Sequence, residues 1–128
     1  MKLDTEDDII AVRRRVRDIA EMRKFDTFAT AAITTATSEL ARNVIVHAGK
    51  GVAWIEEVSD GVHIGVRIVF EDQGPGISDI ARVLAGGYST ARSMGLGVSG
   101  SRRLVDVFDI ESKPGEGTKV TVLKWKRF

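Results

Sequence analysis

The chain has 128 residues, 43% of them hydrophobic and 29% charged, which is typical of one globular domain with a hydrophobic core, here expected over residues 1–128. Nineteen basic and eighteen acidic residues leave a formal net charge of +1, so the overall charge indicates no nucleic-acid partner and no membrane surface. The absence of Cys excludes disulfides and thiolate metal sites, and no apolar run approaches the roughly 18 residues of a membrane-spanning helix.

Two helices are predicted in the first 48 residues. Apolar residues at helical spacing begin after Asp7 or Asp8, one of which is the expected cap, and the pattern runs to about Lys24. A second helix is expected from about Asp26 to Ala48, where Gly49 ends it. The expected buried stripes are Ile9, Val12, Val16 and Ile19 on the first helix, and Ile33, Thr37, Leu40, Val44 and Ala48 on the second.

The rest of the chain predicts two hairpins around a glycine-rich segment. The expected strands are Val52–Glu57, Val62–Glu71, Phe108–Ser112 and Thr118–Lys126. Between the hairpins, residues 72–100 indicate loops around a short helix near Ile80–Leu84, followed by a helix over about Leu96–Val107. Paired strands argue against alternating βαβ units, so we expect an α+β fold: a two-layer α/β sandwich with a mixed, mostly antiparallel sheet and helices on one face.

The second helix carries a first candidate cluster, Glu39 and Asn43. Residues four apart share a helix face, and this pair lies beside the buried stripe. A carboxylate can take a proton from an attacking hydroxyl, and an amide oxygen can ligate Mg²⁺. A solvated polar edge explains the same pair. His47, one turn further on, is expected to interact with the last carbonyls of the helix.

A second cluster follows a predicted strand directly: Asp72-Gln73-Gly74-Pro75-Gly76-Ile77. An Asp at a strand end can accept a hydrogen bond from the exocyclic amine of adenine, and the glycines let the backbone approach a flat base. A plain turn suits the same residues.

The third cluster, Gly95-Leu96-Gly97-Val98-Ser99-Gly100, opens a predicted helix. A glycine-rich helix N-terminus offers unpaired N–H groups to phosphate. Its spacing matches a dinucleotide-binding motif, but that motif should follow the first strand of a βαβ unit, and here it stands late in the chain after a long loop. The P-loop pattern is absent from the sequence.

In this order the three clusters resemble the N, G1 and G2 boxes of the GHKL (Bergerat-fold) ATPases, and Gly115-Glu116-Gly117-Thr118 resembles the last element of that family. The resemblance implies binding of ATP or ADP with Mg²⁺. It makes Glu39 the catalytic base and Asn43 the Mg²⁺ ligand. The nucleotide-binding residues that it implies are Asn43, Asp72, Gly74, Gly76, Ile77, Arg92, Gly95, Leu96, Gly97, Gly100 and Thr118.

Within the family, the stretches Thr34–Asn43, Ala48–Gly51 and Glu71–Ile77 look most like the bacterial anti-sigma-factor serine/threonine kinases, and among them the RsbT-like switch kinases of the stressosome. Sigma-binding relatives carry an Arg two residues before the first G2 glycine. Here that position is Ser93, and Arg92 beside it is the candidate for the γ-phosphate. A lid is expected over about residues 82–94.

The resemblance implies STAS-domain proteins as substrates and a PP2C-type phosphatase as a second partner. A direct anti-sigma factor, or a binding module that nucleotide gates without significant kinase activity, stays open as an alternative. The opening Met1–Asp8 is short and acidic, unlike a signal peptide, so the expected location is the cytoplasm.

Overall fold

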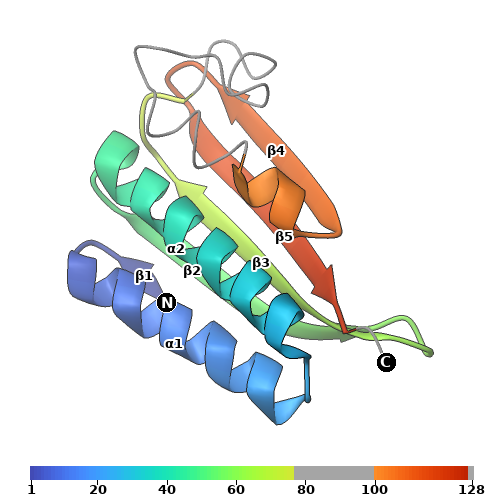
Figure 1. Cartoon of the computed structure of the whole chain (residues 1–128). Coiled ribbons are helices and arrows are strands. Elements are labelled where there is room, and N and C mark those ends of the chain that lie inside the picture. The colour runs from blue at the N-terminus through green and yellow to red at the C-terminus, as the bar shows by residue number, and fades with distance from the viewer. Residues whose placement is uncertain (77–99, 127–128) are drawn as a thin grey trace.

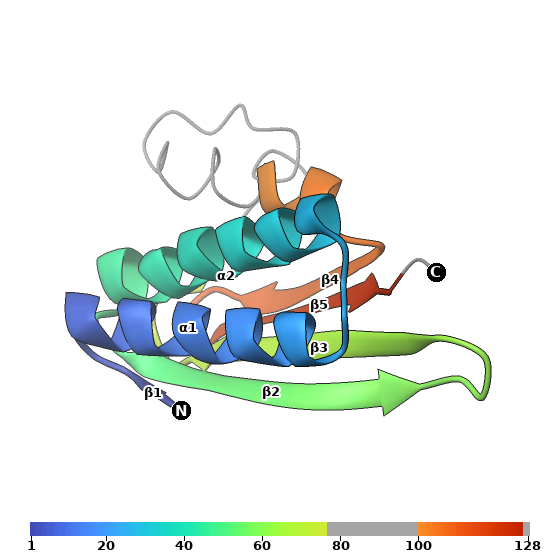
Figure 2. The same cartoon turned by 60° about the horizontal axis from the view of Figure 1, so that its bottom comes forward.

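The computed structural model describes residues 1–76 and 100–126, which form two layers (Figure 1). The elements in chain order are β1 (Lys2–Leu3), α1 (Glu6–Met22), α2 (Thr27–Ala48), β2 (Gly51–Ser59), β3 (Ile64–Asp72), β4 (Val107–Lys113) and β5 (Gly117–Trp125). Helices α1 and α2 lie side by side over one face of the sheet (Figure 2). The expected two-layer α+β sandwich is therefore confirmed.

The strand order is β1-β2-β3-β5-β4, and every pairing among these strands is antiparallel. Both predicted hairpins form, and they join through β3 and β5. The pairings among the described strands are thus all antiparallel, whereas the sequence predicts a mixed, mostly antiparallel sheet. The register places Gly51, Asp72, Thr118 and Ser112 in one row across four strands.

Capping residues determine where α1 begins and where α2 begins and ends. The cap of α1 is Thr5 rather than Asp7 or Asp8, because the Thr5 side chain accepts from the Asp8 N–H while the Asp8 carboxylate accepts from the Thr5 N–H. Asp26 caps α2 through the N–H of Ala29, 2.7 Å away. Gly49 ends α2 as predicted, with φ at 85°.

The core lies between the helices and the sheet. All four residues of the first predicted stripe are buried, as are Ile33, Thr37, Leu40 and Val44 of the second. Ala48 is only partly buried, because it lies in the last turn of α2 against the loop after β3. The sheet contributes the buried side chains of Ala53, Val66, Ile68, Phe70, Val120 and Val122.

Strand β3 begins two residues later than expected. The Asp60 carboxylate accepts the N–H groups of Val62 and His63 and so extends the turn. Val62 is consequently 83% exposed, whereas Ile68 and Phe70 are buried as the predicted alternation requires. The sequence pattern locates the strand, and the side chain of the turn residue decides where pairing starts.

The helix expected over Leu96–Val107 is described only at residues 100–104, and it ends earlier, because Val107 already pairs with Leu123 in the sheet. The short helix expected near Ile80–Leu84 lies outside the described residues. Neither α1 nor α2, nor the turn of helix at 100–104, is long and apolar enough to cross a membrane.

Candidate functional site

The loop after β3 is held against the end of α2. Asp72 Oδ1 accepts the N–H of Gly74 at 2.9 Å, which folds the loop back at the strand end. A Cβ on Gly74 would lie 2.6 Å from Ala48 Cβ, so only glycine allows this approach. Gly76 has φ at 75°, and a Cβ there would meet the backbone carbonyl of Lys113. Gly74 therefore holds the loop after Asp72 against the last turn of α2, and Gly76 holds the same loop against the end of β4.

Asp72 faces the helical layer at the end of its strand. It lies two residues after buried Phe70 on the same face of the sheet, and its cross-strand neighbour is Thr118. Burial raises the pKa of Asp72, opposed by the N–H groups of Gly74 and Thr118. Thr118 shares a 2.8 Å hydrogen bond with Ser112. Across the neighbouring strands, Asp72 thus presents a half-buried carboxylate beside the hydroxyls of Thr118 and Ser112. This arrangement suits recognition of the polar edge of a ring.

Three polar side chains on α2 recur at every fourth residue: Glu39, Asn43 and His47. Asn43 is 9% exposed, and its Nδ2 finds no hydrogen-bond partner among the described residues. A solvated edge is therefore the wrong interpretation for Asn43. Glu39 is exposed, one turn earlier, so it is open to a second molecule. A buried amide without a partner inside the fold indicates a ligand-binding position.

His47 continues this face toward Asp72. Burial lowers the pKa of His47, and the negative charge of Asp72 opposes that shift. Its Nε2 is buried without a hydrogen-bond partner among the described residues, so the expected contact with the last helix carbonyls is not supported. The four-residue spacing from Asn43 is the signal that could have placed His47 in the site.

We expect His47→Phe to flatten the dependence of stability on acid pH. Since the folded-state pKa of His47 lies below 6.5, the fold favours the neutral ring. The stability from this group is complete above about pH 6.5 and is lost as the pH falls through the folded pKa. Denaturant midpoints measured from pH 8 to pH 5 should fall more in the wild type than in His47→Phe.

The other histidine provides the control. His63 is exposed in the β2–β3 hairpin, so His63→Gln should keep the contribution of His47. Equal pH slopes in the wild type and His47→Phe would contradict the buried neutral imidazole.

The remaining predicted site residues divide into two groups. Gly100 lies at the start of the described helical turn, exposed and with nothing within 4 Å of a Cβ placed there. Outside the described residues are Ile77, Arg92, Gly95, Leu96 and Gly97, together with the expected lid. The described residues therefore bring together the positions from α2, the loop after β3 and β5, but not the phosphate-binding segment.

No group of three or more His, Cys, Asp or Glu side chains gathers as a metal site in residues 1–76 and 100–126. The donor that fits Mg²⁺ is the amide of Asn43, since this ion accepts a neutral oxygen and takes its other ligands from waters and phosphates. The amide nitrogen of Asn43, which has no partner among the described residues, could donate to a ligand oxygen such as that of a phosphate while the amide oxygen faces the ion.

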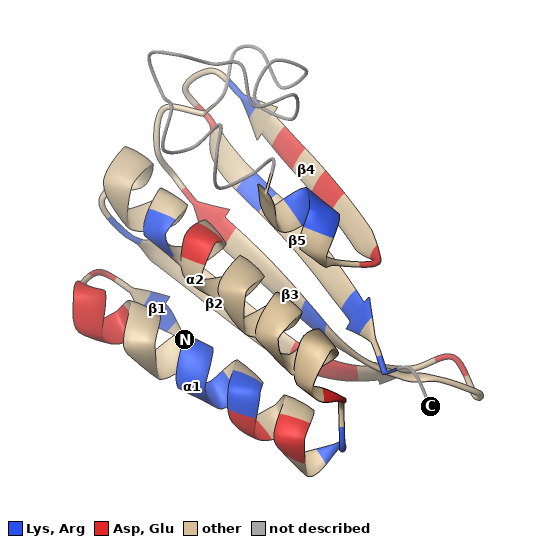
Figure 3. Ribbon diagram, in the orientation of Figure 1, with Lys and Arg blue, Asp and Glu red and all other residues tan. Residues whose placement is uncertain are grey.

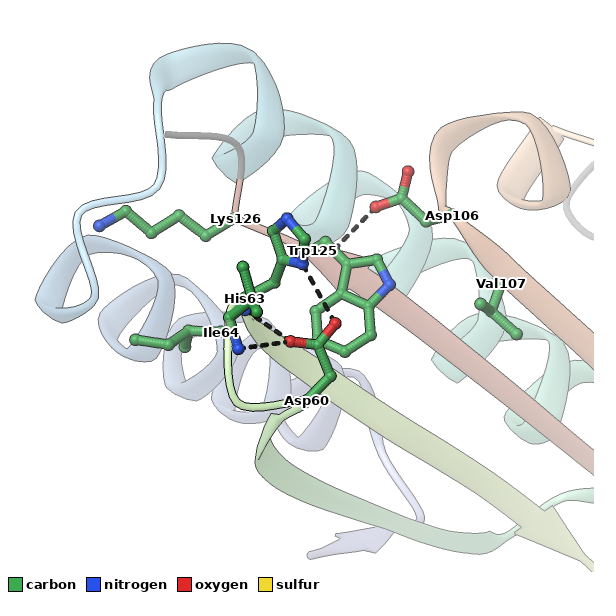
Figure 4. A pocket seen from close by; sticks show the side chains of 8 residues that line it. Asp60, His63, Ile64, Asp106, Val107, Trp125 and Lys126 are labelled. Carbon is green, nitrogen blue, oxygen red and sulfur yellow. Dashed lines mark hydrogen bonds and ion pairs between the residues drawn. The ribbon is translucent and has the colours of Figure 1, made fainter.

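A cavity of about 820 Å³ lies at the other end of the sheet (Figure 4). Its walls include Asp60, His63 and Trp125, and the carboxylate of Asp60 lies 3.1 Å from Nδ1 of His63. Hydrogen bonds from His63 and Val62 lower the pKa of Asp60 to about 2. This cavity adjoins Ile64, eight residues along β3 from Asp72, roughly 26 Å away, so it is separate from the α2 site.

Three comparisons bear on the family. Residues 29–127 match the family model of histidine kinase-, DNA gyrase B-, and HSP90-like ATPases. Serine/threonine-protein kinase RsbT of Bacillus subtilis (strain 168) is 46% identical over 127 residues, covering 99% of this chain and 96% of that protein. An anti-sigma F factor of Thermoanaerobacter sp. (strain X514) is 31% identical over 101 residues, 74% of this chain and 69% of that protein.

Among solved structures, the fold is similar to the histidine kinase domain of the Erythrobacter litoralis EL346 blue-light activated histidine kinase. The TM-score is 0.55 at 24% sequence identity, over 76% of this chain and 44% of that one. At this identity the likeness concerns the fold alone.

Proposed function

Since the chain belongs to the histidine kinase-, DNA gyrase B-, and HSP90-like ATPases, as an RsbT-like serine/threonine protein kinase, we propose that it transfers the γ-phosphate of ATP to STAS-domain proteins. The pathway is a partner-switching stress response in the cytoplasm. Once released from these substrates, the kinase binds and activates a PP2C-type phosphatase.

The proposal is supported by the arrangement of Glu39, Asn43 and Asp72 along α2. A buried Asn43, whose amide nitrogen has no partner in the described part of the chain, follows an exposed Glu39 by one turn of the same helix, and the loop after β3 lies against the end of that helix beside Asp72. A binding residue, a general base and a carboxylate for the nucleobase thus lie along one line. This order suits a nucleotide whose γ-phosphate points toward the solvent-exposed side chain.

In the proposed reaction each site residue has a separate role. Asp72 accepts a hydrogen bond from the adenine amine, and Asn43 offers its amide oxygen to Mg²⁺, which would neutralise phosphate charge. The oxygen of the substrate hydroxyl forms a bond to the γ-phosphorus, and the bond between that phosphorus and the leaving ADP oxygen breaks. Glu39 accepts the proton that this hydroxyl loses. In this proposal Gly95, Gly97 and Gly100 bind phosphate, and Arg92 is the candidate for the γ-phosphate.

The direct test incubates the purified chain with labelled ATP, Mg²⁺ and the STAS proteins encoded beside it. Transfer of label to Ser or Thr of a STAS protein is the expected result. A chain that binds ATP and a STAS protein but transfers no label would be a nucleotide-gated binding module. Binding of a sigma subunit in place of a STAS protein would favour a direct anti-sigma factor, the activity named for the 31% identical relative.

We expect Asn43→Ala to weaken Mg²⁺-dependent ATP binding about tenfold and to slow turnover as well, because the substitution removes a ligand rather than a base. Titration calorimetry with and without Mg²⁺ measures the first effect. Ser38→Ala is the matched control, since Ser38 Oγ already donates to the Thr34 carbonyl at 3.1 Å on the same helix. Unchanged Mg²⁺ dependence in Asn43→Ala would assign the ion to other residues.

A further inference from the structure

The first half of α2 borders a groove that no proposed role yet uses. The groove has a volume of about 460 Å³ and lies between α2 and the helical turn at residues 100–104. Its lining residues are Asp26, Phe28, Ala29, Ala31, Ala32, Thr35, Arg103, Leu104 and Lys124. Figure 2 shows the two helical segments side by side above the sheet.

The groove is apolar and accessible on its α2 side. Phe28 is 89% exposed, an unusual state for a phenylalanine, and the side chains that follow it along the groove are small. Figure 3 shows that the first half of α2 carries no charged side chain. Small residues allow another backbone or side chain to approach the helix closely, with Phe28 as an apolar contact at one end.

The groove leads directly to the proposed catalytic residue. Phe28, Ala32, Thr35, Glu39 and Asn43 follow the spacing of one helix face, so the groove wall and the catalytic residues form a single stripe. Thr35 ends the groove one turn before Glu39. At 1.5 Å per residue, Phe28 lies about 16 Å along the helix from Glu39.

The charges at the groove indicate the chemistry of the occupant. Asp26 is engaged as the cap of α2, and Lys124 lies 3.9 Å from Asp106. Arg103 is exposed and has no ion pair among the described residues. A molecule in the groove therefore meets an apolar wall at Phe28 and, at Arg103, a positive charge without an ion pair among the described residues.

We propose that this groove docks the protein substrate, which presents an apolar side chain to Phe28 and a carboxylate to Arg103. The inference rests on the proposed kinase function and adds to it a surface that selects the substrate. The apolar contact and the acceptor hydroxyl then lie about 16 Å apart on the substrate, because the helix fixes the distance from Phe28 to Glu39.

The test measures KM and kcat for the STAS protein labelled in the kinase assay, using Phe28→Ser and Arg103→Glu. Each variant is expected to raise KM for the STAS protein about tenfold, with kcat and ATP affinity within twofold of the wild type. Arg103→Lys should recover most of the Arg103→Glu loss, because it restores the charge. Val62→Ser is the matched control, since Val62 is also exposed but lies in the far hairpin.

The outcomes are separable. Wild-type chain that labels no STAS protein contradicts the proposed function, whereas wild-type labelling with unchanged KM in both variants overturns the groove alone. Sedimentation of the same variants tests a second copy as the occupant. A wild-type dimer that Phe28→Ser converts to a monomer, at unchanged KM, would make the groove a self-association surface and overturn substrate docking.

Discussion

Glu39→Gln is expected to slow phosphoryl transfer to the protein substrate by roughly 10²–10⁴-fold while leaving ATP affinity unchanged. Glu39 is exposed and lies one helical turn before Asn43, on the side of the site that a second protein can reach. An amide cannot accept the proton of the acceptor hydroxyl. The loss corresponds to about 3–5 kcal/mol of activation free energy.

Single-turnover labelling at saturating ATP separates this loss of rate from a loss of binding, and calorimetry with ATP checks that affinity is kept. Glu21→Gln is the control, because Glu21 is an exposed helical glutamate at the far end of α1 and pairs only loosely with Arg17, at 3.9 Å. Full kinase activity in Glu39→Gln would leave Glu39 as a solvated helix residue and would favour the binding-module alternative.

Asp72→Asn is expected to weaken ATP and ADP binding about 30- to 100-fold, equivalent to roughly 2–3 kcal/mol. In the proposed site, the adenine amine needs an acceptor at the end of β3. The Asp72 carboxylate already accepts from Gly74, and an amide retains a single acceptor oxygen for both roles. Calorimetry with ADP measures the effect without turnover, and unchanged affinity would remove Asp72 from the nucleotide site.

The same substitution should not destabilise the chain without nucleotide. Burial raises the folded-state pKa of Asp72, so the ionised carboxylate opposes folding at neutral pH and opposes it less as the pH falls through that pKa. Asp72→Asn removes this charge, and its melting temperature at pH 7 should match or exceed that of the wild type. Asp109→Asn, an exposed acid on β4, is the control and should change neither binding nor melting.

The sequence predicts the described helices and strands well because apolar periodicity reports the face that each element buries. The errors lie where a polar side chain decides the boundary. Thr5 rather than Asp7 or Asp8 caps α1, and the Asp60 carboxylate delays β3 to Ile64. Such local hydrogen bonds add no periodic signal, so the pattern locates an element without fixing its ends.

For the site, spacing alone places Glu39 and Asn43 on one helix face, but it cannot show that Asn43 is buried. That burial depends on which elements pack beside α2, a property of the whole fold. The position of Asp72 next to the helix end depends likewise on the contact of Gly74 with Ala48. The sequence predicts that His47 interacts with the helix end because that terminus is its nearest sequence feature, whereas its surroundings in space include Asp72.

Because Phe28 and Glu39 lie on one face of α2, the number of residues between them determines whether both side chains face the same direction. Inserting one residue between Phe28 and Glu39 would rotate the two ends by about 100° relative to each other, so the groove and the proposed catalytic carboxylate would face different directions. Point substitutions keep that alignment, whereas insertions and deletions break it. Relatives that dock a substrate in the same way should therefore vary at the positions between Phe28 and Glu39 while the number of residues between these two stays the same.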